Sequence, residues 1–359
     1  MQARAICLIF FGSLGLSTTA QVKQDTGNYS EVDSFALTVK YKNDYILLSK
    51  ELTAPYYDDT RKLRSIFKWI TANIEYDYRF INNGKEIIEP ECSDKIDCSL
   101  IQQDWENRYI KRILKTRKAV ADGYCRLFKK LCELNNIQCE MISGYARTKA
   151  YQVGNPMSVN HCWNAVMIDT NWYYTDVTWA AGFCVEDDET GRLLRYVKDF
   201  KEYYWLKPFA EFSRNHFPKK GYFTETTTLS KEQFFNKPFY YSVEVLENIK
   251  ENAPATGVIK VKKSDTIFFS FEYKKEIRQI QINSNVYRNP SLWMTVPAGR
   301  KKTKLVKDSW AEKKQQYIPF EKHDNCYSFY YVVKDMSLYY LELSFDFKPS
   351  IRYRVRVEN

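Results

Sequence analysis

Two residues with catalytic potential lie in neighbouring apolar runs near the middle of the chain. His161 begins the run HCWNAVMI, and Asp176 lies towards the end of the run NWYYTDVTW. A short polar turn at residues 169–171 separates the runs, so two adjacent strands are predicted. Thiol-dependent enzymes use a histidine to move a proton and a carboxylate to hold the imidazole tautomer. The pattern therefore predicts a proton-handling pair.

The preceding stretch, residues 119–145, must supply a nucleophile if such a pair is to work. A helix, a turn at residues 135–136 and a strand ending at Gly144 are predicted, since four apolar residues recur at helical spacing: Leu127, Phe128, Leu131 and Leu134. The start of a helix suits a reactive cysteine, because the helix dipole and an adjacent imidazole both favour the thiolate. That position holds Ala121, and the methyl group of alanine cannot attack a carbonyl.

The order and spacing of these motifs resemble the transglutaminase-like superfamily, in the kyphoscoliosis-peptidase-type branch that includes many secreted bacterial proteins. The resemblance rests on VADGYC (120–125), SGY (143–145), HCWN (161–164) and WYYTDVTW (172–179). It implies an α+β, papain-like domain whose central helix packs on an antiparallel sheet. It also implies that His161 is the general base, that Asp176 orients the imidazole and that the nucleophile position falls on Ala121.

Three aromatic residues, Trp163, Tyr124 and Trp69, are candidates to border the substrate cleft. For Trp163 and Trp69 the alternative is a place in the core. Trp69 belongs to one apolar stripe of a helix that begins near residue 58, and such a stripe is most simply buried.

Three hypotheses about activity follow. In the first, the protein is a pseudoenzyme that keeps the cleft and binds a peptide, a protein or a cell-envelope ligand. In the second, the chain is the Cys-to-Ala form of an active thiol peptidase or protein-glutamine acyltransferase with a Cys-His-Asp triad. In the third, Cys125, one helical turn after Ala121, has become the nucleophile. The alternative for Cys125 is a small buried core thiol.

The first 20 residues are typical of a signal peptide. Arg4 precedes an apolar run that is too short to span a bilayer, and small residues suited to cleavage follow before Gln21. We therefore expect an exported protein, periplasmic or extracellular, without a membrane span after cleavage; the alternative is a retained N-terminal anchor. Eight cysteines then remain, of which Cys92 and Cys98 could close a small loop.

Composition argues against a metal or another cofactor. The chain has only three histidines and lacks a Cys-x-x-Cys pair, so zinc is a poor reading. The acidic cluster at residues 186–189 lacks the alternating ligand spacing of a calcium loop and is predicted to be a hairpin tip. His216 and His323 are each interpreted as lone structural or surface histidines without a nearby partner.

Four segments are predicted along the chain: a signal peptide (1–20), a transglutaminase-like domain (21–216), a linker with a short helix (217–255) and an all-β immunoglobulin-like sandwich (256–359). The last segment has period-two apolar runs separated by turn signals. Its final strand carries three arginines on one face: Arg352, Arg354 and Arg356. A solvated face is the simpler interpretation, and attraction to an anionic cell-envelope polymer or lipid surface is the alternative. No nucleic-acid motif is present.

Overall fold

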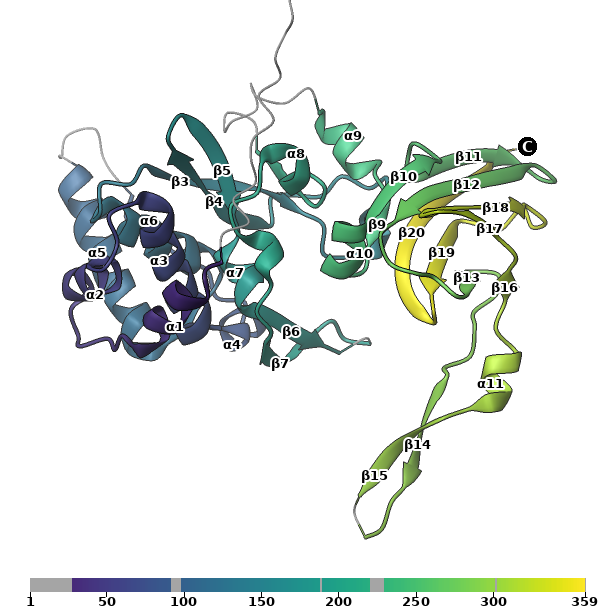
Figure 1. The fold of residues 1–359 in the computed structure, drawn as a ribbon, viewed down its shortest axis with the longest axis horizontal. Helices are drawn as coiled ribbons and strands as arrows, with labels where there is room; N and C mark the ends of the chain where they lie inside the picture. Colours follow the sequence, from purple (N-terminus) through teal and green to yellow (C-terminus); the bar gives the residue numbers. More distant parts are fainter. Residues whose placement is uncertain (1–27, 92–97, 188, 220–228, 301, 359) are drawn as a thin grey trace, which may run out of the picture.

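The computed structural model describes residues 28–91, 98–187, 189–219, 229–300 and 302–358. The predicted signal peptide and Cys92 lie outside these residues. A helix-rich N-terminal part is joined to a C-terminal part made of sheets, from which a long ribbon extends (Figure 1). Within the described ranges, no helix is both long and apolar enough to cross a membrane.

The N-terminal part is built on a helical layer around α3 and α6. Its helices are α1 (Ser30–Thr38), α2 (Tyr45–Thr53), α3 (Asp59–Asn73), α4 (Tyr78–Asn82), α5 (Cys98–Thr116) and α6 (Ala121–Glu133). The Asp58 side chain accepts a hydrogen bond from the backbone N–H of Arg61 and so caps α3. Leu127, Phe128 and Leu131 are fully buried on α6, as their helical spacing predicts.

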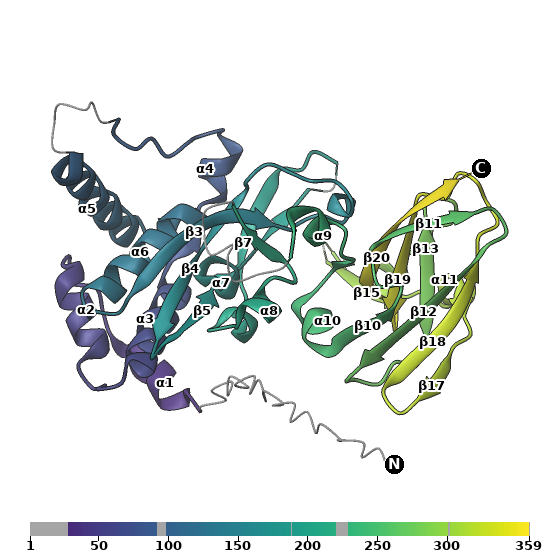
Figure 2. The same ribbon diagram turned by 90° about the horizontal axis from the view of Figure 1, so that it is seen from above.

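An antiparallel sheet lies against α6, as the resemblance implied. Its strands are β3 (Cys139–Ala146), β4 (His161–Ile168), β5 (Asn171–Thr175) and β8 (His216–Pro218), in the order β5-β4-β3-β8. Figure 2 shows α6 beside β3 and β4, which it contacts. Asp169 has a φ of 55° in the tight turn between β4 and β5. A short parallel pair, β1 (Glu75–Tyr76) and β2 (Lys118–Ala119), leads into α6.

The strand predicted through Trp179 ends earlier than expected. β5 stops at Thr175, and α7 (Val177–Ala181) begins directly after Asp176. The reason is local: the Asp176 carboxylate accepts the backbone N–H of Trp179 and caps the new helix. The N-terminal part continues with the hairpin β6 (Gly182–Glu186) and β7 (Leu193–Lys198), then η2 (Glu202–Tyr204) and α8 (Phe209–Phe212). η1 (Ala150–Gln152) lies between β3 and β4.

Two sheets share one hydrophobic core in the C-terminal part. One contains β10 (Ile249–Ala253), β12 (Thr266–Tyr273), β18 (Cys326–Val332) and β17 (Glu321–His323). The other contains β11 (Val258–Lys262), β20 (Lys348–Glu358), β19 (Tyr340–Phe345), β13 (Ile280–Ser284) and β16 (Tyr317–Ile318), with β9 (Phe239–Tyr240) also paired to β20. The immunoglobulin-like topology stays a prediction, and the parallel pairing of β11 with β20 was not expected.

The described part of the segment predicted as a linker, residues 217–219 and 229–255, carries regular structure. It contains α9 (Lys231–Phe235) and α10 (Val243–Asn248), and its strands β9 and β10 pair into the C-terminal sheets. The extended ribbon consists of β14 (Trp293–Pro297) and β15 (Thr303–Lys307), followed by α11 (Ser309–Lys313) (Figure 1).

Candidate functional site

The carboxylate of Asp176 is the centre of a buried polar cluster. The Asp176 side chain is fully buried and faces three donors. Its Oδ2 lies 2.8 Å from Nε2 of His161 and 3.1 Å from Nε2 of His216, while its Oδ1 accepts the Trp179 N–H at 2.9 Å. An ionised carboxylate only accepts hydrogen bonds, so both Nε2 atoms carry protons. The cluster therefore fixes the orientation of two imidazole rings.

Burial and hydrogen bonding act in opposite directions on Asp176. Burial would raise the pKa of this carboxyl group, but the charge and hydrogen bond of His161, together with the hydrogen bond from His216, hold the pKa below its ordinary value. The carboxylate is thus ionised across the physiological range. Burial lowers the pKa of His216 to about 4, which keeps that ring neutral at neutral pH although Asp176 pulls the other way.

The imidazole ring of His161 lies between Asp176 and the indole ring of Trp179. The ring of Trp179 stacks on the imidazole with centroids 5.2 Å apart, and 8% of the His161 side chain is exposed. Because Nε2 is bound to Asp176, Nδ1 is the nitrogen that can accept a proton. In the described part of the chain, no hydrogen bond engages this Nδ1. The geometry leaves one ring nitrogen of His161 without a hydrogen-bond partner among the described residues, in a side chain that is 8% exposed.

His216 is the residue that sequence reasoning missed. The expectation of a lone histidine without a nearby partner is wrong, because the side chain is fully buried and bonds to the same Asp176 oxygen as His161. Its Nδ1 lies 2.7 Å from the side-chain amide of Asn215. The ring also stacks on Phe212, with centroids 4.3 Å apart. His323, by contrast, lies exposed on β17, as expected.

Ala121 is the first residue of α6, the position predicted for the nucleophile. The strands that deliver it, β1 and β2, also bring Tyr76 towards the cluster. Burial, with smaller contributions from Cys184, Cys162 and Asp176, raises the pKa of Tyr76 to about 12. Tyr76 therefore lies within electrostatic range of Asp176 and of two thiols, Cys162 and Cys184. That the Ala121 methyl points at the His161 ring stays a prediction.

The thiols beside α6 are engaged with each other. Cys125 is 1% exposed, and its side chain is hydrogen-bonded to that of Cys162. The carbonyl of Cys125 accepts from Nδ2 of Asn164 at 3.1 Å, which ties α6 to β4. Burial raises the pKa of Cys125 well above its ordinary value, with further contributions from Cys162 and Asp176. A nucleophile needs the opposite shift, so these observations favour the core-thiol interpretation of Cys125.

The three aromatic candidates for substrate contact lie in the core. Trp69, Tyr124 and Trp163 each have 0% exposure. The Trp69 Nε1 donates to the carbonyl of Val39, and the Tyr124 hydroxyl donates to the carbonyl of Ile74. Trp163 packs edge-on against His216 with centroids 5.0 Å apart. Trp163 thus packs against the cluster, and all three side chains are too buried to offer a surface to a ligand in this structure.

A metal ion would compete directly with the hydrogen bonds of the cluster. His161, Asp176 and His216 present potential ligand atoms within 4.8 Å of one another. The same atoms already form the two histidine–aspartate contacts, so a cation would have to displace both in a buried site. The absence of a cofactor stays a prediction. Among the described cysteines, Cys98 is disulfide-bonded and six are free: 125, 132, 139, 162, 184 and 326.

A helix packed on an antiparallel sheet, with a buried aspartate orienting a histidine, defines a protein of the thiol-enzyme-like class. Comparison with known proteins agrees with this class, because residues 47–177 match the family described as transglutaminase-like superfamily. Residues 47–177 are therefore similar to the domain of the transglutaminase-like superfamily.

Two curated relatives show how far the likeness extends. Human kyphoscoliosis peptidase is 27% identical over 247 residues, covering 68% of this chain and 34% of that protein. Its mouse counterpart is 25% identical over 283 residues, covering 75% of this chain and 39% of that protein. The chain thus spans little more than a third of the length of these relatives. A solved transglutaminase structure is 12% identical, covers 51% of this chain and 39% of that chain, and has a TM-score of 0.25.

Proposed function

We propose that this protein is exported and that its transglutaminase-like cleft binds a peptide or protein segment without performing acyl transfer. In an intact site of this kind the thiolate would attack a carbonyl, His161 would carry the proton and Asp176 would hold the ring tautomer. Loss of the nucleophile alone lowers the turnover of a hydrolase roughly a million-fold. With alanine at position 121, binding is the function that remains available to the cleft.

One observation carries the proposal. His161 and Asp176 keep their hydrogen bond, at 2.8 Å. The two thiols, Cys125 and Cys162, are hydrogen-bonded to each other. Export is supported by the composition of residues 1–20.

An activity assay tests the catalytic half of the proposal. Purified wild-type protein should neither cleave casein nor incorporate monodansylcadaverine into it, and iodoacetamide should change nothing. Thiol-sensitive turnover by the wild type would overturn the proposal and point to Cys125 instead. A Cys125→Ala variant would then show whether that thiol is responsible.

A selection experiment tests the binding half. Peptides enriched from a random displayed library on wild-type protein should bind at least tenfold more weakly to Ala121→Trp, since an indole at the predicted nucleophile position would obstruct the cleft. Ala298→Trp is the matched control, because Ala298 is exposed in the loop between β14 and β15. Equal binding to all three proteins would show that the cleft is not the binding site.

The second hypothesis, a Cys-to-Ala form of a thiol peptidase or acyltransferase, is supported by the same intact pair. It predicts that Ala121→Cys acquires iodoacetamide-sensitive turnover of casein or monodansylcadaverine. A reactive but non-catalytic Ala121→Cys protein would favour the binding module.

A further inference from the structure

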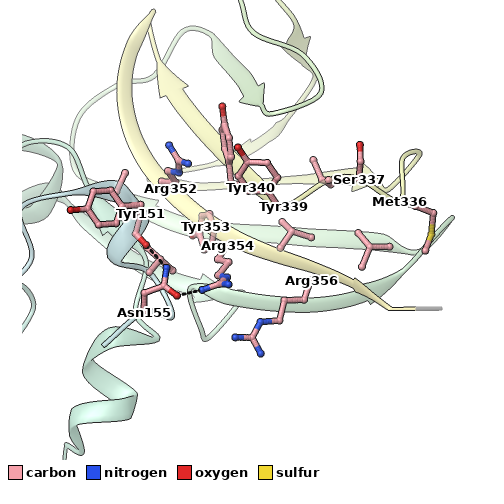
Figure 3. Close-up of a pocket in the computed structure, with 15 residues that line it drawn as sticks. Tyr151, Asn155, Met336, Ser337, Tyr339, Tyr340, Arg352, Tyr353, Arg354 and Arg356 are labelled. Atoms are coloured by element: carbon pink, nitrogen blue, oxygen red, sulfur yellow. Dashed lines mark hydrogen bonds between the residues drawn. The ribbon is translucent and has the colours of Figure 1, made fainter. Parts of the chain in front are cut away.

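A pocket lies between the two parts of the protein and shares no lining residue with the His161–Asp176 cluster. Its volume is about 530 Å³, which falls within the range of pockets that hold small ligands, roughly 300–1,000 Å³. One wall is the segment around η1, and the other is formed by β20 and the residues that precede β19 (Figure 3). Residues distant in sequence therefore build one cavity.

The pocket wall is positively charged. Arg352, Arg354 and Arg356 occupy alternate positions of β20 and all line the cavity, as their period-two spacing predicted. The lining contains neither aspartate nor glutamate. Lys260 on β11 is the register partner of Arg356 and is also exposed, so it adds positive charge to the same face of the sheet.

Two of these arginines lack a balancing carboxylate. Arg354 donates to the carbonyl of Gly154 at 3.3 Å and to the side-chain oxygen of Asn155, both of them neutral acceptors. Figure 3 shows the contact with Asn155. Arg356 is exposed and makes no ion pair or hydrogen bond within the described ranges. Arg352 differs from them, because one of its guanidinium nitrogens is 3.9 Å from a Glu342 oxygen.

Apolar and aromatic surface flanks the charged wall. Tyr151 from η1 is 57% exposed, and Tyr339 on the opposite side is 58% exposed. Met336, 41% exposed, extends this surface. Exposed tyrosine rings beside arginines combine packing area with hydrogen-bonding hydroxyls, a combination enriched where proteins bind peptides and other proteins.

We propose that this pocket, the arginine pocket, binds an acidic peptide segment in extended conformation. Guanidinium groups recognise carboxylates through paired, charge-assisted hydrogen bonds. Alternate residues along a strand are about 6.6–6.8 Å apart, and alternate side chains of an extended peptide have the same spacing. A peptide with glutamates at every second position and apolar residues between them therefore matches both the arginines and the tyrosines. This site is additional to the cleft of the proposed function.

Fluorescence anisotropy with a labelled peptide of alternating glutamate and valine tests the arginine pocket in the full chain. Binding should weaken about tenfold or more in Arg356→Gln, the loss expected from one charge-assisted contact. Replacing every glutamate in the peptide by glutamine should abolish binding. Arg278→Gln is the matched control, because Arg278 is exposed elsewhere in the C-terminal part and should leave affinity unchanged.

Two further measurements keep the test decisive. Gly154→Ala should also weaken binding, since an added Cβ would lie 2.8 Å from Cγ2 of Val258 and 3.2 Å from Cδ of Arg354 and would push the η1 segment off the wall. A photo-crosslinking version of the peptide should label residues near Tyr151 or Tyr339, which locates the site even if a variant unfolds. Equal affinity for wild type and Arg356→Gln, crosslinking elsewhere, or binding of polygalacturonate but not of the peptide would overturn the proposal.

Discussion

The buried His216 should make the transglutaminase-like domain sensitive to acid. Its pKa is lowered to about 4 by burial in the folded protein, whereas an unfolded histidine titrates near 6.5. Between these pH values the histidine is protonated in the unfolded chain but not in the folded chain. The free energy of unfolding therefore has its full value above pH 6.5 and falls as the pH approaches 4. A difference of this size between the folded and unfolded pKa corresponds to about 3 kcal/mol in the free energy of unfolding. Because the pKa of Asp176 is also lowered in the folded protein, its protonation reduces the free energy of unfolding further at still lower pH.

His216→Gln isolates this contribution. Glutamine keeps an N–H donor for Asp176 but does not titrate, so the variant should lose about 3 kcal/mol of the pH dependence between pH 6.5 and 4, whatever its stability at pH 7. Urea unfolding at several pH values, followed by tryptophan fluorescence, measures this, because six of the eight tryptophans precede residue 217. His323→Gln, at an exposed site, should keep the wild-type slope. Identical slopes in wild type and His216→Gln would refute the reasoning.

Three further predictions concern packing and thiols. Gly144→Ala should prevent soluble expression or cost several kcal/mol in urea unfolding, since the new Cβ would lie 2.3 Å from the carbonyl oxygen of Phe217. Arg64→Met should lower the free energy of unfolding by about 2–3 kcal/mol, because it leaves the partly buried Asp33 without its two hydrogen bonds from Arg64; unchanged stability would contradict this. Among the six free thiols of the described residues, titration with a disulfide reagent should reach only the two half-buried ones before unfolding: Cys184 and Cys326.

The sequence was most informative where periodicity and turn chemistry agreed. The helix α6 and the strands β3, β4 and β5 follow from helical spacing, alternating apolar runs and one polar turn. α7 was missed because Val177, Thr178 and Trp179 are strand formers by propensity. The capping bond from Asp176 overrides that preference. The strands β9 and β10 were missed because they are short and lie among linker-like residues.

The candidate site divides in the same way. His161 and Asp176 could be paired from sequence because their strands are adjacent in the chain and joined by a tight turn. His216 could not be added, because it reaches the cluster only when β8 pairs with β3, and no local pattern specifies that pairing. A histidine opening a short apolar run was the available signal. Burial of Trp69 follows from the apolar stripe of its helix, whereas burial of Tyr124 and Trp163 depends on how the helices and the sheet pack.

The pKa of a thiol introduced at residue 121 tests most directly whether His161 and Asp176 could activate a nucleophile at that position. In Ala121→Cys, the pH dependence of iodoacetamide alkylation, followed at that residue by mass spectrometry, should give a pKa below about 7.5, and His161→Ala should raise it. A pKa near 8.5 that ignores His161 would mean that residue 121 does not face the imidazole, and would contradict the interpretation of this cleft as a thiol site without its thiol.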